Sequence, residues 1–237
     1  MNVAEMGAFR GKRVLLLQGP IGPFFWRFKK DLTQVGAQVF KVNFNGGDCL
    51  FYPHGAINFR GNLEEWPAYF EAILERLHID VVVLFGDCRP IHRVAHEITH
   101  RRNLNIGVFE EGYIRPDYVT LEGFGANNHS LLPRIPEFYF NNPTPFLEFP
   151  AAVKNAYWYA ALWGILYYFV SGLLKPVFKQ YQHHRRLSWL EAVPWLRSFW
   201  RKYHFMIKEH WILAHLKTRL KGAYFLVPLQ VNNDAQV

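Results

Sequence analysis

Four short apolar runs, separated by segments with helical spacing, fill most of the first half of this 237-residue chain. They are KRVLLLQ (12–18), AQVFKVNF (37–44), DVVVLFGD (80–87) and NIGVFEE (105–111). Strands that are largely apolar and alternate with helices are typical of a parallel sheet covered on both faces. The sequence therefore predicts an α/β fold with a Rossmann-like parallel sheet.

Helices are expected between and after these strands, at 24–36, 62–78 and 90–103, where apolar residues recur with helical spacing. In open parallel sheets, ligands bind beyond the C-terminal ends of the strands. The loops at those ends read QGPIGP, NGGD, GDCRP and EEGYIRP. We therefore expect substrate-binding residues in these loops, namely Gly19, Gly22, Asp87 and Arg89.

Glu110 and Glu111 end the last of the four strands and place two carboxylates at the edge where chemistry is expected. Adjacent carboxylates repel, so one of them should have a raised pKa unless Arg115 or Arg89 compensates the charge. The alternative is that both glutamates are simply exposed in a loop or at a helix N-terminus. The position at a strand end is where chemistry would be expected, and the residues alone leave both interpretations open.

Two weaker patterns occur in the same half. GPIGPFF (19–25) lacks the spacing of a phosphate-binding loop, which leaves an acceptor-site loop or a tight turn. His92, His96 and His100 share one helix face, as metal ligands can. Arginines flank them, so the prediction is a polar helix face without a metal.

Cys49 and Cys88 are the two cysteines, and they form no CxxC pair, which indicates a reducing compartment. The first 13 residues lack the apolar segment of a signal peptide, so the cytoplasm is expected. The formal charge is −1 over residues 1–150 and +9 over residues 151–237. A basic, aromatic-rich half suits nucleic acid, an anionic membrane or a phosphorylated substrate, and composition does not choose among them.

Residues 155–174 form a run of 20 without a charge. Its length permits a transmembrane helix. Its tyrosines and tryptophans, and the basic sequence that follows, favour a helix that lies in the membrane plane or lines a groove. YQHHRR (181–186) then offers His183, His184 and Arg185, either as an anion site or as a solvated helix end.

Several segments together resemble the capsule polysaccharide biosynthesis/export family, in its KpsS/LipB-type branch. They are GDCRPIHRVAHEI (86–98), VFEEGYIRPDYVTLE (108–122), NNHSLLPRIPEFY (127–139), YQHHRR (181–186) and YFLVPLQVNNDAQV (224–237). The resemblance implies a glycosyltransferase, a retaining β-Kdo transferase that moves Kdo from CMP-Kdo to a phosphatidylglycerol-type lipid. It implies a protein that is cytoplasmic and peripheral on the inner membrane of Gram-negative cells.

The same resemblance implies roles for individual residues. A retaining transfer needs a carboxylate near the anomeric carbon. By the family pattern, Glu111 is the nucleophile, Glu110 its acidic neighbour and Arg115 a partner for the donor carboxylate. Related branches have Asp where this sequence has Glu111. The residues that would line the same crevice are Asn127, Asn128 and His129. No metal or other cofactor is implied, and the partners are anionic phospholipid, CMP-Kdo and other capsule assembly proteins, with no nucleic acid.

Relatives of this kind are two-lobed and GT-B-like, and their second lobe binds CMP through a His-Pro signature. No histidine here precedes a proline. We therefore expect a Rossmann-like domain (1–150), a basic, aromatic, membrane-facing helical segment (151–221) and the first strand of an incomplete nucleotide-binding half (222–237). On this division the chain should not bind CMP measurably, and a non-catalytic, membrane-associated module of capsule assembly or export stays open as an alternative.

Overall fold

The computed structural model describes residues 3–112, 118–126, 129–142, 157–182, 189–225 and 227. The chain divides into two compact units after residue 182. The predicted strand over 222–237 falls largely outside the described residues, since 226 and 228–237 are not among them.

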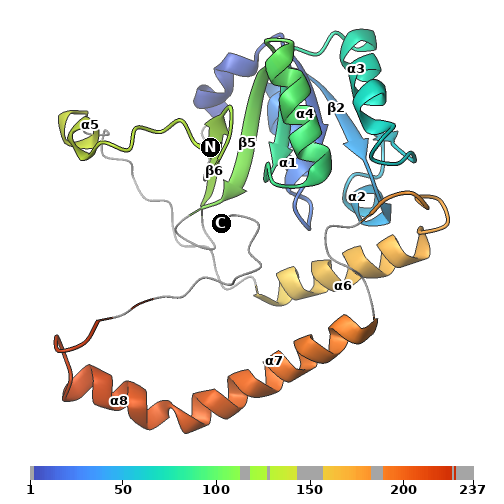
Figure 1. The fold of residues 1–237 in the computed structure, drawn as a ribbon. Helices are drawn as coiled ribbons and strands as arrows, with labels where there is room; N and C mark the ends of the chain where they lie inside the picture. Colours follow the sequence, from blue (N-terminus) through green and yellow to red (C-terminus); the bar gives the residue numbers. More distant parts are fainter. Residues whose placement is uncertain are drawn as a thin grey trace. The chain divides into compact units, whose positions relative to one another are not determined.

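The first unit contains a six-stranded sheet in the order β3-β2-β1-β4-β5-β6 (Figure 1). The strands are β1 (Arg13–Leu17), β2 (Gln38–Asn43), β3 (Ile57–Asn58), β4 (Val81–Phe85), β5 (Asn105–Glu111) and β6 (Val119–Gly123). β1 to β5 pair in parallel, and β6 pairs antiparallel with β5. The four predicted strands and the Rossmann-like α/β class are confirmed.

Helices cover both faces of this sheet. The unit contains η1 (Val3–Phe9), α1 (Phe24–Gln34), α2 (Gly46–Phe51), α3 (Trp66–Arg76), α4 (Pro90–Arg101), α5 (Pro136–Asn141) and α6 (Tyr157–Leu173). α3 and α4 contribute to the apolar core on one face, whereas η1 and α1 contribute to the core on the other. The helices predicted over 24–36, 62–78 and 90–103 are confirmed as α1, α3 and α4.

Burial on both faces explains why the central strands are continuous apolar runs. In β1, Leu15 and Leu17 belong to the core beside α3, while Val14 and Leu16 belong to the core beside α1. All four side chains are fully buried. A strand in this position has no solvent-facing side on which polar residues could alternate.

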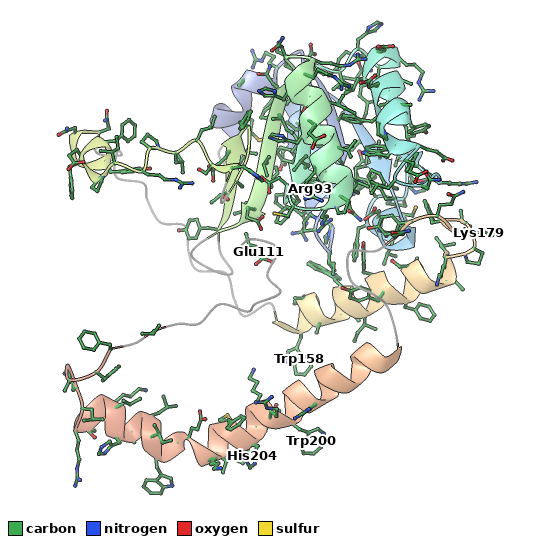
Figure 2. The ribbon with its side chains drawn as sticks, in the orientation of Figure 1. Arg93, Glu111, Trp158, Lys179, Trp200 and His204 are labelled. Carbon is green, nitrogen blue, oxygen red and sulfur yellow. The ribbon has the colours of Figure 1, made fainter. Side chains whose placement is uncertain are left out.

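The second unit contains α7 (Trp189–Lys208) and α8 (His210–Thr218). Trp200 (Figure 2) and Trp211 are largely exposed on these helices, and basic residues such as Arg201 and Lys202 are also exposed there. Across the part of the chain that the structure describes, no helix combines the length and the apolar character needed to cross a bilayer.

Candidate functional site

The site begins at the C-terminal end of β4. Gly86 follows the strand with φ +70°, a left-handed conformation that favours glycine, and its amide donates to the Phe109 carbonyl at 2.8 Å. This turn directs the Asp87 side chain inward, where only 2% of it is exposed. A carboxylate this deeply buried requires hydrogen-bond donors around it.

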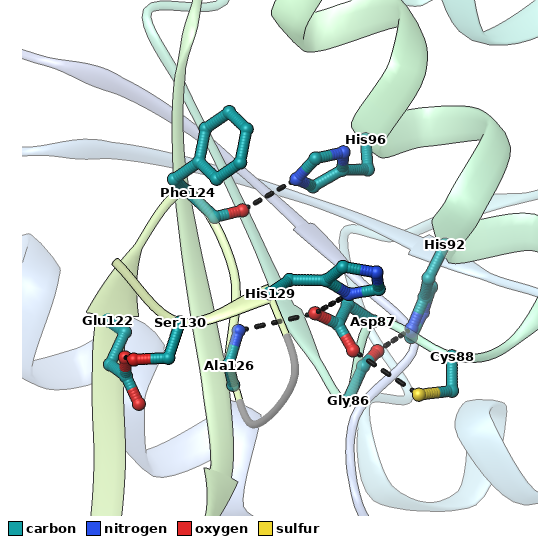
Figure 3. Close-up of polar contacts among 10 residues, drawn as sticks. All are labelled: Gly86, Asp87, Cys88, His92, His96, Glu122, Phe124, Ala126, His129 and Ser130. Atoms are coloured by element: carbon teal, nitrogen blue, oxygen red, sulfur yellow. Dashed lines mark hydrogen bonds and ion pairs between the residues drawn. The ribbon is translucent and has the colours of Figure 1, made fainter. Parts of the chain in front are cut away.

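Three donors surround Asp87 (Figure 3). His129 Nδ1 donates to Oδ2 at 3.0 Å, and the Ala126 amide donates to the same oxygen at 3.2 Å. The Cys88 thiol donates to Oδ1 at 3.4 Å. Burial by itself raises the pKa of Asp87, but the hydrogen bonds from these three groups outweigh it and hold that pKa below its usual value. Asp87 is therefore a buried anion that positions the His129 ring, and the His129 side chain remains 53% exposed.

A reversal of the chain after β6 brings His129 to Asp87. Phe124 has φ +78°, which is rare for a residue with a side chain. His96 Nε2 donates to the Phe124 carbonyl at 2.7 Å, and the Phe124 ring packs edge-on against His96 and His100. His96 and His100 of α4 therefore hold the turn that returns the chain toward Asp87, and Figure 3 shows the bond made by His96.

The third histidine of this row also contacts backbone. His92 is fully buried, and its Nδ1 donates to the Gly86 carbonyl at 2.5 Å. The prediction of a polar helix face is therefore wrong for His92, because the ring is enclosed beside the β4 turn. Within the described residues, no group of three His, Cys, Asp or Glu side chains could hold a metal ion.

The two glutamates at the end of β5 lie in different surroundings. Glu110 is 8% exposed, and its Oε1 accepts the Glu111 amide at 3.0 Å. A Cβ atom at Gly86 would lie 3.6 Å from the other Glu110 oxygen, so this carboxylate lies next to the β4 turn. The charge of Glu110 also contributes to raising the pKa of Cys88 to about 11, although burial is the main cause. Glu111 is exposed at the strand end (Figure 2).

A second polar cluster lies at the ends of β1 and β2, covered by α6. Gln18 donates to the Tyr181 hydroxyl at 2.7 Å, and Asn45 donates to the Tyr167 hydroxyl at 2.9 Å. Burial raises the pKa of Asp48, while the positive charges of Lys41 and Arg89 offset part of that rise. The sequence reasoning missed Gln18, Asn45 and the two tyrosines, and the NGGD segment was the signal that could have pointed to them.

Glycines at these strand ends allow close packing. A Cβ atom at Gly46 would overlap the Val170 carbonyl, and one at Gly47 would overlap the Tyr167 ring. A Cβ atom at Gly22 would lie 2.9 Å from the Trp163 ring. A Cβ atom at Gly19 would lie 3.0 Å from the Phe25 ring in α1. In this structure these loops contact α6 and α1, and the roles of Gly19 and Gly22 in substrate binding stay predictions.

The structure brings Asp87, His129 and Glu110 to the same edge of the sheet, with Glu111 exposed beside them. Arg89 precedes α4 and acts electrostatically on Asp48 and on the Tyr167 and Tyr181 hydroxyls. The remaining predicted site residues lie outside the described residues; they are Arg115, Asn127, Asn128, His183, His184 and Arg185.

A mainly parallel α/β sheet with buried and exposed carboxylates at its C-terminal edge defines a Rossmann-like protein, and such folds bind ligands beyond this edge. Residues 80–237 match the model of a family described as capsule polysaccharide biosynthesis protein. The capsule polysaccharide export protein KpsS of Escherichia coli is 36% identical over 96% of this chain. The capsule polysaccharide modification proteins LipB of Neisseria meningitidis serogroups B and A are 35% and 36% identical over 95% of the chain. The chain belongs to the capsule polysaccharide biosynthesis family.

The chain spans 59% of the length of KpsS and 56% of the length of each LipB protein. Among solved structures, an epimerase from Methanothermobacter thermautotrophicus matches 45% of this chain with 11% identity and a TM-score of 0.27. That similarity is too low to carry an argument.

Proposed function

We propose that this protein is a retaining β-Kdo transferase that moves Kdo from CMP-Kdo to a phosphatidylglycerol-type lipid during capsule assembly. The observation that carries the proposal is the carboxylate pair at the end of β5, where Glu111 is exposed and Glu110 is buried against the β4 turn. The names of its relatives support a role in capsule export or modification.

The proposed chemistry has two displacements. The Glu111 carboxylate attacks the anomeric carbon of Kdo, and the bond to CMP breaks with its electrons leaving on the phosphate. An acceptor hydroxyl then displaces Glu111 and gives up its proton. His129 is assigned as the acceptor of that proton, because Asp87 holds its Nδ1 and leaves the other ring nitrogen to take the proton. This chemistry uses no metal and no other cofactor.

Glu110 has a separate part in this scheme. Its carboxylate accepts the Glu111 amide and so fixes the backbone that carries the nucleophile. Arg115 is proposed to bind the donor carboxylate, because a guanidinium forms two parallel hydrogen bonds with such a group.

The lipid acceptor requires work at a membrane surface. The proposed location is the cytoplasmic face of the inner membrane, as a peripheral protein that works with other capsule assembly proteins. The charge of +9 over residues 151–237 supports attraction to anionic phospholipid.

The test is transfer of radiolabelled Kdo from CMP-Kdo to phosphatidylglycerol vesicles. It is run with this chain alone and with this chain fused to the portion of E. coli KpsS that lies outside the match. Labelled lipid from either protein, lost on Glu111→Gln, is the expected result. The matched control is Glu137→Gln, which changes an exposed glutamate on α5 and should leave transfer unchanged.

No labelled lipid from either protein, when E. coli KpsS is active in the same assay, would contradict the proposal. Vesicle binding without transfer would instead favour the non-catalytic membrane module.

A further inference from the structure

Helix α6 has two apolar faces. Its inner face packs on α2, and its docking residues are Trp163, Tyr167, Val170 and Ser171. The side chains on its outer face are between 49% and 79% exposed; they are Trp158, Leu162, Ile165, Phe169 and Leu173. The outer residues follow each other at intervals of three and four, so they form one continuous stripe.

Such a stripe is unusual on a helix that packs on one side only. A surface helix of this kind normally carries charged and polar residues opposite its packed face. The sequence of α6 contains no charged residue at all. A contiguous exposed apolar surface marks a site of interaction with a partner.

Charge and residue type identify the partner. Between Glu148 and Glu191 the sequence has five basic residues and no acidic one. Lys175 and Lys179 follow the C-terminal end of α6, and Trp158 lies at its other end (Figure 2). Tryptophan and lysine beside an apolar face are typical of helices at the surface of anionic membranes. Protein interfaces, in contrast, are depleted in lysine.

The inner face connects this stripe to the edge of the sheet. Besides the bond from Asn45 to Tyr167, the Gly47 amide donates to the Ser171 hydroxyl at 3.0 Å. The bond from Gln18 to Tyr181 links the segment after α6 to the end of β1. α6 is therefore fixed to the same edge of the sheet that carries Asp87 and Glu110.

We infer that the outer face of α6 inserts into the interfacial layer of an anionic bilayer and holds the C-terminal edge of the sheet at the level of the lipid headgroups. The inference deepens the proposed function, because it names the surface that would present the lipid acceptor to that edge. The apolar contact with the bilayer is thereby assigned to α6 and not to the basic helices of the second unit.

The test is flotation of the 237-residue protein with vesicles of phosphatidylglycerol and phosphatidylcholine. In the variant Ile165→Ser/Phe169→Ser the charge is unchanged, and the partition coefficient should fall by at least about tenfold. The matched control is Leu131→Ser/Phe140→Ser, which removes two apolar side chains from 129–142 that are at least as exposed, and its partition coefficient should change by less than about twofold.

Two further measurements make each outcome decisive. Thermal unfolding should be the same for the α6 variant and the wild type, because both replaced side chains are exposed. Size-exclusion chromatography with light scattering should give the same mass for both proteins. Wild-type-like flotation of the variant would overturn the inference, and so would a wild-type dimer that the variant dissociates, because the stripe would then bind a second copy.

Failure of this inference differs from failure of the proposed function. Flotation requires no sugar donor, so its result is independent of transfer. Transfer to a short-chain, water-soluble acceptor should be unchanged in the α6 variant, whereas Glu111→Gln should lose transfer and keep flotation.

Discussion

His129 Nδ1 lies 3.0 Å from Asp87 Oδ2, across a separation of 42 residues. Asp87 follows β4 and His129 follows β6, so their contact depends on the chain reversal at Phe124. The contact gives the buried Asp87 carboxylate one of its three donors.

Replacing Asp87 by Asn should destabilise the fold by about 2 kcal/mol near neutral pH, because an amide is a weaker acceptor and brings its own buried donors. The pKa of Asp87 is lowered from 3.8 in the folded state. Its stabilisation is therefore present above about pH 4 and is lost as the pH falls through the lower folded-state pKa.

Urea unfolding between pH 2 and pH 7 measures this effect. The wild type should lose stability at the acid end, and Asp87→Asn should lose less. Asp31→Asn, at an exposed position on α1, is the control and should follow the wild type. Equal acid dependence in Asp87→Asn and the wild type would show that Asp87 is not a stabilised anion.

The docking of α6 should depend on Gly47. Alanine at this position would overlap the Tyr167 ring, so Gly47→Ala should cost about 2 kcal/mol in the free energy of unfolding. Gly172→Ala is the matched control, because a Cβ atom there meets nothing within 4 Å. Since alanine favours helix, this control should stabilise α6 by about 0.5 kcal/mol. Urea unfolding measures both values, and equal stability of the two variants would contradict the close packing.

Glu111→Gln and Glu110→Gln should have different effects. Glu111 is exposed, so its replacement should leave the unfolding free energy unchanged while it lowers transfer by at least about 100-fold. In Glu110→Gln the side-chain carbonyl can still accept the Glu111 amide, so a smaller loss of transfer is expected. Initial rates of Kdo transfer from CMP-Kdo measure the loss in each variant. A larger loss for Glu110→Gln than for Glu111→Gln would contradict the assignment of Glu111 as the nucleophile.

Binding to anionic vesicles should weaken as salt is added. The +9 balance over residues 151–237 attracts phosphatidylglycerol, and ions screen this attraction. Raising the salt from about 50 mM to about 500 mM should reduce the partition coefficient several-fold, because the screening length falls to a few ångströms. Co-sedimentation measures it, and binding that neither salt nor alkali can reverse would indicate a membrane-spanning segment instead.

The parallel strands could be predicted from the sequence because burial on both faces leaves continuous apolar runs, as in Val81 to Phe85 of β4. Strand β6 could not, because Val119 to Gly123 lies at the sheet edge, is partly exposed and carries a glutamate. The two-residue β3 is too short to give a pattern. The sequence therefore predicted an entirely parallel sheet and did not reveal the antiparallel edge strand β6.

The acidic pair could be placed at a strand end from the sequence, since strand ends follow from the apolar runs. The partnership of Asp87 with His129 could not, because it depends on Phe124 adopting a left-handed conformation that its residue type does not suggest. The row of histidines on α4 was visible, but His92 and His96 bind backbone carbonyls and His100 packs against the Phe124 ring. Spacing alone cannot distinguish such a row from a row of metal ligands.

The reversal at Phe124 has a consequence for the dynamics of the protein. Residues 124–126 and 129 contact α4 and Asp87 through a small number of hydrogen bonds, and the Phe124 amide also donates to the Ile106 carbonyl of β5 at 3.1 Å. Such a segment can open while the sheet stays folded, and amide hydrogen exchange would report it as a separate, less protected unit. A ligand that requires contact between Asp87 and His129 would then bind more weakly, in proportion to the fraction of molecules in which this segment is closed.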